Sequence, residues 1–122
     1  MRPRILLVDD EDTVREVVSD YFRRKGFEVL LAPSGSEAMA IADQTPINIV
    51  VMDIDLAGES GMELLKFFKS NFPKLPVIMF TGLPANDDLV EQAWFRGANG
   101  FMRKSSSLDD LYAAVKSYVE GH

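Results

Sequence analysis

The sequence predicts an α/β fold in which one five-stranded parallel sheet is covered by helices on both faces. Short apolar runs alternate with helical patterns along the whole chain. The run 47–52 is almost continuously apolar, which is typical of a strand buried on both faces of a parallel sheet. No repeat or linker interrupts the 122 residues, a length that suits one domain. We therefore expect a single domain over residues 1–122.

Five apolar runs have the length and the flanking turn residues of strands. The fourth run begins with Pro76, a position at which a strand tolerates proline because no ladder hydrogen bond is lost there. The predicted strands are residues 4–8, 27–31, 47–52, 76–80 and 100–103.

Three of the five predicted helices begin with a capping box, in which a Ser or Thr is followed three residues later by an acidic residue. These start at Thr13, Ser34 and Ser107. Gly26 is expected to end the first helix, because glycine readily adopts the left-handed backbone of a C-cap. The residues expected on the inward faces are Val14, Val17, Val18, Tyr21 and Phe22, then Ala38, Ile41 and Ala42, and finally Leu108, Leu111, Val115 and Val119.

The other two helices lie in the second half of the chain. One begins near Gly61 and is stopped by the Asn-Phe-Pro sequence at 71–73. The other is capped by Asn86 or Asp87 and ends at Gly97. Strict alternation of strands and helices with right-handed crossovers requires a parallel, doubly wound sheet. With five strands, the flavodoxin-like order 2-1-3-4-5 is the natural solution, and it places the first and third strands side by side.

Charged side chains follow the predicted strands where ligands bind to this type of sheet, just outside the strands' carboxyl ends. Asp9 and Asp10 follow the first strand, Asp53 follows the third with Asp55 two residues later, and Lys104 follows the fifth. Clustered carboxylates repel one another unless a cation neutralises them, and oxygen ligands suit Mg²⁺. A lysine opposite them suits a phosphoryl group. The pattern predicts a metal-assisted phosphoryl acceptor.

Composition excludes several other kinds of site. The chain has no cysteine, which excludes disulfides, thiolate metal sites and a cysteine nucleophile. Its only histidine is His122, so no internal histidine can carry a phosphoryl group or bind metal. The net charge of −6 disfavours direct binding of nucleic acid. No apolar run approaches the roughly 20 residues that span a membrane. We expect a cytoplasmic protein with no membrane or nucleic-acid partner.

Four separated motifs, in this order and at these spacings, closely resemble the receiver domain of two-component response regulators. They are LLVDDE, VVMDIDLAGESG, MFTG and GANGFMRK, and the match covers essentially the whole chain. The resemblance implies that Asp53 is the phosphoacceptor. It also implies that Asp10 binds Mg²⁺ or Mn²⁺ directly, that Asp9 holds the ion through water, and that the backbone carbonyl of Asp55 completes the protein's ligands.

The resemblance also assigns roles at the other strand ends. Thr81 and Lys104 are implied to contact the phosphoryl oxygens. Phe101 occupies the family's switch-aromatic position, so the resemblance implies a switch formed by Thr81 and Phe101. A partner surface over the fourth helix, fifth strand and fifth helix is implied to include Val90, Trp94 and Phe101. The donor is expected to be a phosphohistidine on another protein, either a sensor histidine kinase or a histidine phosphotransfer protein. The output partner is not specified by the sequence.

The residue types support these roles on chemical grounds. A carboxylate is a competent nucleophile towards phosphoryl groups. Phosphoryl transfer is catalysed mainly by positioning and by stabilisation of charge on the equatorial oxygens. Two positions depart from the family pattern, since Ser105 and Ala57 replace usual prolines. A cis peptide before serine would cost about 2.5–4 kcal/mol, so we expect the 104–105 bond to be trans.

Two other classes of function remain as alternatives. The sequence Asp53-Ile54-Asp55 also matches the core of haloacid-dehalogenase-like phosphatases. In that class, however, the nucleophile follows the first strand, a Thr or Val stands where this chain has Ala57, and the chain is longer. A flavodoxin-like binding module without phosphorylation is the second alternative. Such a module requires a phosphate loop rich in Ser, Thr and Gly after the first strand, where this chain is acidic.

Overall fold

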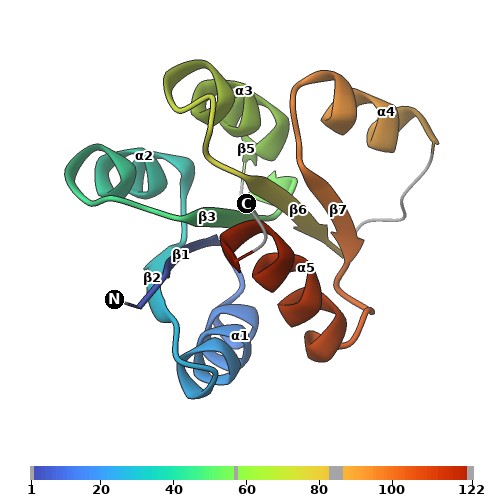
Figure 1. Cartoon of the computed structure of the whole chain (residues 1–122). Helices are drawn as coiled ribbons and strands as arrows, with labels where there is room; N and C mark the ends of the chain where they lie inside the picture. The colour runs from blue at the N-terminus through green and yellow to red at the C-terminus, as the bar shows by residue number, and fades with distance from the viewer. Residues whose placement is uncertain (1, 57, 83–86, 121–122) are drawn as a thin grey trace.

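Five parallel strands form the main sheet, in the order β2-β1-β3-β6-β7 (Figure 1). The structure is a computed structural model that describes residues 2–56, 58–82 and 87–120. Counted within the main sheet, this is the predicted order 2-1-3-4-5. The strands are β1 (Arg4–Val8), β2 (Glu28–Ala32), β3 (Ile49–Met52), β6 (Val77–Thr81) and β7 (Gly100–Arg103).

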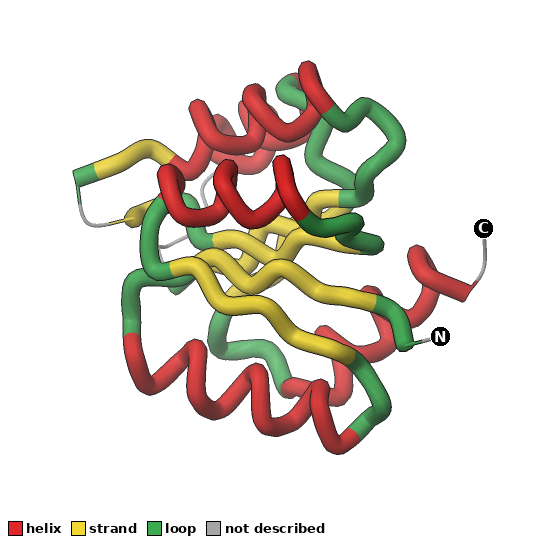
Figure 2. The backbone as a smooth tube through the Cα atoms, turned by 90° about the vertical axis from the view of Figure 1, so that its left-hand side faces the viewer, coloured by secondary structure: helices red, strands yellow, loops and turns green. Residues whose placement is uncertain are grey.

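Helices cover both faces of this sheet (Figure 2). Figure 1 shows α1 and α5 together on one face and α2, α3 and α4 on the other. This is the doubly wound arrangement expected from alternating strands and helices. The helices are α1 (Asp12–Arg24), α2 (Gly35–Gln44), α3 (Gly61–Asn71), α4 (Asp87–Phe95) and α5 (Leu108–Glu120).

The sheet separates two apolar clusters. One packs alternate residues of the strands against α1 and α5, and Phe22 and Leu111 are at its centre. The other packs the opposite strand faces against α2, α3 and α4 around Phe68. All four residues of β3 are buried, which confirms that this strand is central and covered on both faces. Burial on both faces holds the strand ends, and therefore the side chains that follow them, in fixed positions.

Two of the three predicted N-cap residues are present. The Ser34 hydroxyl accepts a hydrogen bond from the Glu37 N–H, and the Ser107 hydroxyl accepts one from the Asp110 N–H. Gly26 has a φ of 94°, as expected for the glycine that follows α1. No cis peptide bond occurs in the described residues, so the prediction of a trans bond before Ser105 is confirmed. Asn86 and Ala57 lie outside the described residues.

Three details differ from the sequence-based expectations. The Thr13 capping box is wrong, because α1 begins at Asp12 and its N-cap is Glu11. Val17 was expected on the inward face but is 51% exposed, because it lies at the edge of the apolar stripe. A short antiparallel pair, β4 (Asp55–Leu56) with β5 (Glu59–Ser60), was not predicted. Two-residue strands are too short to produce an alternating pattern.

No helix in the described ranges has the length and apolar character that crossing a bilayer requires.

Candidate functional site

The pairing of β1 with β3 positions the first two carboxylates. Val8 and Met52 are register partners at the ends of these strands, so Asp9 and Asp53 emerge side by side. The backbone ladder continues one step further, since the Asp53 N–H donates to the Val8 carbonyl at 2.9 Å. Both aspartates are nearly inaccessible, with exposures of 1% for Asp9 and 4% for Asp53. The fold therefore places two buried carboxylates at the carboxyl edge of the sheet.

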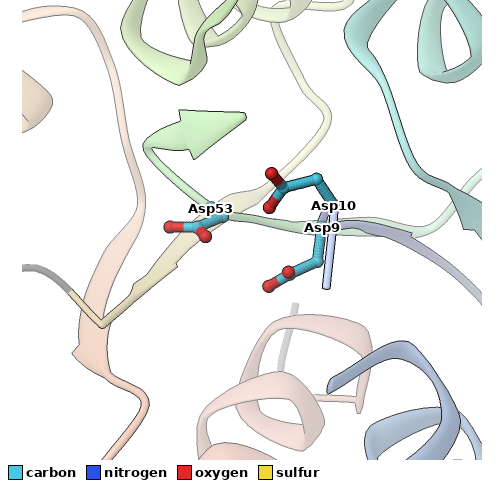
Figure 3. Close-up of side chains that lie close together, drawn as sticks. All are labelled: Asp9, Asp10 and Asp53. Atoms are coloured by element: carbon cyan, nitrogen blue, oxygen red, sulfur yellow. The ribbon is translucent and has the colours of Figure 1, made fainter. Parts of the chain in front are cut away.

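Asp10 completes an acidic cluster with these two residues. One carboxylate oxygen from each of Asp9, Asp10 and Asp53 lies within 4.8 Å of the others. Figure 3 shows the Asp10 side chain turned towards Asp53, with Asp9 directed towards the side of α1 and α5. Asp10 is only partly buried, so the cluster opens to solvent on one side. The consecutive residues Asp9 and Asp10 thus converge with Asp53, which is more than 40 residues away in sequence, as predicted from the strand order.

Lys104 supplies the opposing positive charge. Its Nζ lies 2.8 Å from Asp53 Oδ2, 2.9 Å from Asp9 Oδ2 and 2.7 Å from Glu11 Oε1. The contact with Asp9 is an ion pair whose angles do not suit a hydrogen bond. The lysine follows β7, and its backbone N–H donates a hydrogen bond to the backbone carbonyl of Thr81 at 2.8 Å. The outer strands therefore bring the ammonium to the carboxylates of the inner ones.

Burial has opposite consequences for the two kinds of charge. Desolvation raises the pKa of Asp9 above its ordinary value, although the nearby Lys104 ammonium and the Glu11 N–H act in the other direction. Partial burial alone would lower the pKa of Lys104, but hydrogen bonding to its carboxylate partners outweighs this and raises it. Lys104 therefore stays charged throughout the physiological range and supplies a constant positive charge.

Thr81 is the last residue of β6 and is fully buried, one strand away from Asp53. Phe101 lies on the neighbouring strand β7, in register with Met79, and is half-buried against the cluster under α2, α3 and α4. The two residues therefore occupy adjacent strands at one side of the acidic cluster. Because Thr81 is in register with Arg103, the two residues are offset by two register positions.

A close approach of backbone holds α3 behind the acidic cluster. The Gly61 N–H donates to the Ile54 carbonyl at 2.7 Å, and a Cβ on Gly61 would lie 2.6 Å from the Ile54 Cα. Only glycine fits without displacing the backbone that follows Asp53. The Asp55 side chain is exposed, while its N–H lies 3.4 Å from Asp53 Oδ1. The strand pair β4–β5 then leads from Asp55 to the start of α3.

Three further side chains around the cluster were not predicted from the sequence. Glu11 contacts Lys104, Arg15 donates to the Asp9 carbonyl at 2.6 Å, and Glu59 accepts from the Gly35 N–H at 3.1 Å. Glu11 adjoins the Asp9–Asp10 pair, which is the one local signal for any of them. Their partners are 6 to 93 residues away in sequence, so only the folded structure identifies the contacts.

The predicted partner surface is exposed where α4 passes the edge of the sheet. Trp94 is 48% exposed, as expected, and Val90 is partly exposed one turn earlier. Phe95 was not predicted as a surface residue, yet it is 93% exposed. Trp94 and Phe95 are two of the three large apolar residues that are exposed in the described part of the chain.

The acidic cluster has the chemistry of a divalent cation site. All of its ligand atoms are carboxylate oxygens, which hard cations prefer to nitrogen or sulfur. Asp9 Oδ2 is buried and makes no hydrogen bond within the described part of the chain. Lys104 Nζ lies 2.9 Å from this oxygen, and a bound cation would stabilise its charge further. The residues present therefore fit a cation of this class.

The sequence profile of the response regulator receiver domain matches residues 5–116. The chain belongs to this family. The matched region runs from β1 into α5 and includes every residue of the site described above. As a receiver domain, the protein functions in phosphorelay signalling, as a phosphoacceptor rather than as a conventional enzyme.

Individual relatives agree with this assignment. The receiver domain is 31% identical over 115 residues to the heme response regulator HssR of Staphylococcus saprophyticus, covering 94% of this chain and 50% of that protein. It is 28% identical to sporulation initiation phosphotransferase F of Bacillus subtilis, with 98% and 95% coverage. A CheY-like receiver domain protein from Methanospirillum hungatei superposes with a TM-score of 0.94 at 26% identity, covering 99% and 96%. Several of the longer curated relatives extend well beyond the matched region, and the chain spans half of HssR.

Family membership decides between the alternatives left open by the sequence. Because the chain is a receiver domain, we reject the haloacid-dehalogenase-like phosphatase and the flavodoxin-like binding module as alternatives. Asp53 follows the third strand of the chain, the central strand of the sheet, which is the position that spoke against the phosphatase class.

Proposed function

We propose that residues 1–122 act as one receiver domain in which Asp53 accepts a phosphoryl group from a phosphohistidine on another protein. One observation carries this proposal. The Asp53 carboxylate is buried at the sheet edge with Lys104 Nζ 2.8 Å from one oxygen, beside two further carboxylates. A nucleophilic carboxylate thus adjoins a fixed positive charge and a cluster with the chemistry of a cation site.

Asp53, Lys104 and Thr81 have different roles in the proposed transfer. An Asp53 oxygen attacks phosphorus, and the bond from phosphorus to the donor nitrogen breaks, so that the donor imidazole keeps the electron pair. Lys104 neutralises charge on the equatorial oxygens as they pass from donor to acceptor. The Thr81 hydroxyl, at the end of β6, is proposed to donate a hydrogen bond to one of those oxygens. The second Asp53 oxygen becomes the carbonyl of the acyl phosphate.

Mg²⁺ or Mn²⁺ is the proposed cation. Asp10 and Asp53 would hold it directly, Asp9 through water, and the backbone carbonyl of Asp55 would complete the protein's share. When bound, the ion supplies positive charge that screens the anionic donor from the acidic cluster. This assignment rests on the all-oxygen donor set and on the buried Asp9 oxygen.

Millimolar Mg²⁺ is expected to stabilise the unphosphorylated protein, because the ion relieves repulsion within the acidic cluster. At ten times its Kd, binding adds about 1.4 kcal/mol to the free energy of unfolding. Thermal melts with MgCl₂ and with KCl at equal ionic strength measure this effect. Asp10→Ala is expected to lose it and Asp9→Ala to weaken it. A wild-type melting temperature that ignores Mg²⁺ would contradict the cation site.

The effect is expected to decline on acidification. Burial raises the pKa of Asp9, so its carboxylate takes up a proton at a higher pH than an ordinary aspartate does. Protonation removes negative charge from the cluster, and the affinity for the cation falls with it.

The donor and output partners are proposed at the level of class. Receiver domains interact with histidine kinases and histidine phosphotransfer proteins, and we propose one of these as the donor. The exposed surface of α4 with Val90 and Trp94, next to β7 with Phe101, is proposed to meet the output partner. The cytoplasmic location expected from the sequence stays a prediction.

Phosphorylation is proposed to act on that surface through Thr81 and Phe101. A phosphoryl group on Asp53 attracts the Thr81 hydroxyl, and the resulting movement at the end of β6 changes the space beside Phe101 on β7. Trp94, the only tryptophan, is expected to report the change by fluorescence when phosphorylation or beryllofluoride is applied. A shift of this kind requires two states within a few kcal/mol of each other.

Thr81→Ala separates the two events. The variant is expected to keep phosphorylation of Asp53 while the response at Trp94 is suppressed. Amide spectra of α4 and β7 provide the decisive control. If they are identical with and without beryllofluoride in the wild type, the switch does not exist in this chain.

The proposed function is tested by incubating the chain with acetyl phosphate and Mg²⁺ and measuring its intact mass. One phosphoryl group is expected, and chelation of the metal with EDTA is expected to prevent its addition. Absence of any mass change in folded, Mg²⁺-loaded protein would overturn the proposal.

A further inference from the structure

Glu11 uses its side chain in an unusual way for a helix N-cap. Residues in this position ordinarily accept a hydrogen bond from an N–H of the first helical turn. The Glu11 backbone has the extended conformation of an N-cap, at φ −87° and ψ 119°, but its carboxylate makes no such bond. Its Oε1 instead lies 2.7 Å from Lys104 Nζ. The side chain is thus directed across the opening of the site, to a residue 93 positions later in the sequence.

The ammonium of Lys104 is therefore surrounded by carboxylates. An ammonium group has three N–H bonds, and Lys104 Nζ lies within 2.9 Å of three different carboxylates. The three are Glu11, Asp9 and Asp53. A phosphoryl oxygen that comes equally close to Lys104 Nζ meets the negative charge of these carboxylates and has to displace one of them.

Glu11 is the contact that is released at the lowest cost. Asp9 is 1% exposed, and its other oxygen is fixed by the Glu11 N–H at 2.9 Å. Asp53 is the proposed acceptor and must stay beside the incoming group. The Glu11 side chain is 59% exposed, so water replaces Lys104 as its partner when it turns away. Exchange of this contact leaves the buried part of the site unchanged.

We propose that Glu11 is a positioning residue that holds Lys104 above Asp53 before phosphorylation and is displaced by the phosphoryl group. This inference rests on the proposed function and deepens it. Glu11 competes with phosphoryl oxygens for the same ammonium, and so it lowers the affinity of the site for tetrahedral anions. In the unphosphorylated protein, the contact keeps Lys104 above Asp53. An anion has to displace Glu11 before it occupies the site.

The expected effect follows from the exposure of the pair. Half-exposed ion pairs contribute modestly, because solvent screens them and the side chains lose freedom. Removing the competing charge is therefore expected to tighten anion binding roughly two- to five-fold. The gain is expected to shrink as ionic strength rises.

Glu11→Gln in the whole chain tests the proposal. The probe is beryllofluoride at saturating Mg²⁺, with its dissociation constant measured by calorimetry at low and high salt. Glu16→Gln is the matched control, because Glu16 is exposed on α1 and the variant has the same net charge but leaves Lys104 untouched. Glu11→Gln is expected to bind the probe two to five times more tightly than both the wild type and this control.

Each outcome has a distinct meaning. Equal or weaker binding by Glu11→Gln overturns the proposal, as does an equal gain in Glu16→Gln, which would show a general effect of charge. If Glu11 served only to start α1, Glu11→Gln would change the melting temperature and leave the affinity for the probe unchanged. If wild-type protein takes no phosphoryl group at Asp53, the proposed function itself fails, and that result is independent of Glu11.

Discussion

Asp53→Asn is expected to abolish phosphorylation, with incorporation of phosphoryl groups reduced at least on the order of 100-fold. The asparagine side chain has nearly the same volume but is not a nucleophile. The fold is expected to persist, because the position is held by the backbone bond to Val8 and not by the side chain alone. Intact mass after treatment with acetyl phosphate and Mg²⁺ measures the loss.

The matched control for this variant is Asp43→Asn. Asp43 is exposed on α2, so the same chemical change is made away from the acidic cluster. This control is expected to be labelled like the wild type. Continued stoichiometric labelling of Asp53→Asn would show that the nucleophile lies elsewhere.

Lys104→Gln is expected to have the second-largest effect, on both stability and rate. The substitution leaves Asp9 and Asp53 buried without their cationic partner. Breaking a fully buried ion pair typically costs 3–5 kcal/mol, and we expect about 1–3 kcal/mol here because the cluster opens to solvent on one side. The rate of phosphorylation is expected to fall on the order of 100-fold, as when one preorganised donor is removed from a site of developing charge.

Magnesium distinguishes these effects from general damage to the fold. The Lys104 ammonium and the cation compete for the same carboxylates, so Lys104→Gln is expected to gain more stability from Mg²⁺ than the wild type does. Urea titrations with and without Mg²⁺ measure both quantities. Lys66→Gln, at an exposed position on α3, is the control and is expected to match the wild type. A smaller Mg²⁺ effect in Lys104→Gln would contradict the competition.

Most of the fold was predictable because apolar runs indicate which segments are buried and polar caps indicate where helices begin. β3 was recognised as central from its apolar run, and Ser34 and Ser107 were recognised as caps from spacing alone. The start of α1 was not predictable in this way. The Glu11 N–H is taken by Asp9 Oδ1, and the helix begins one residue later, before the Thr13 signal. That bond belongs to the site, so local propensity did not reveal it.

The site itself was predictable to the extent that it follows from topology. Strand order places Asp9 beside Asp53, and β7 brings Lys104 to the same edge. The direction of long side chains does not follow from topology. Glu11 and Arg15 reach their partners through rotamers that are chosen by packing and charge in the folded protein. The exposure of Phe95 was missed for a related reason, since an apolar residue on a helix is ordinarily assigned to the core.

Of the carboxylates that contact Lys104, we expect Asp53 to be the one that becomes phosphorylated. Treatment of the phosphorylated chain with borohydride reduces an aspartyl phosphate to homoserine, and peptide sequencing by mass spectrometry then identifies the position. Homoserine is expected at residue 53 and at no other aspartate. Homoserine at residue 9, 10 or 55, with residue 53 unchanged, would contradict it.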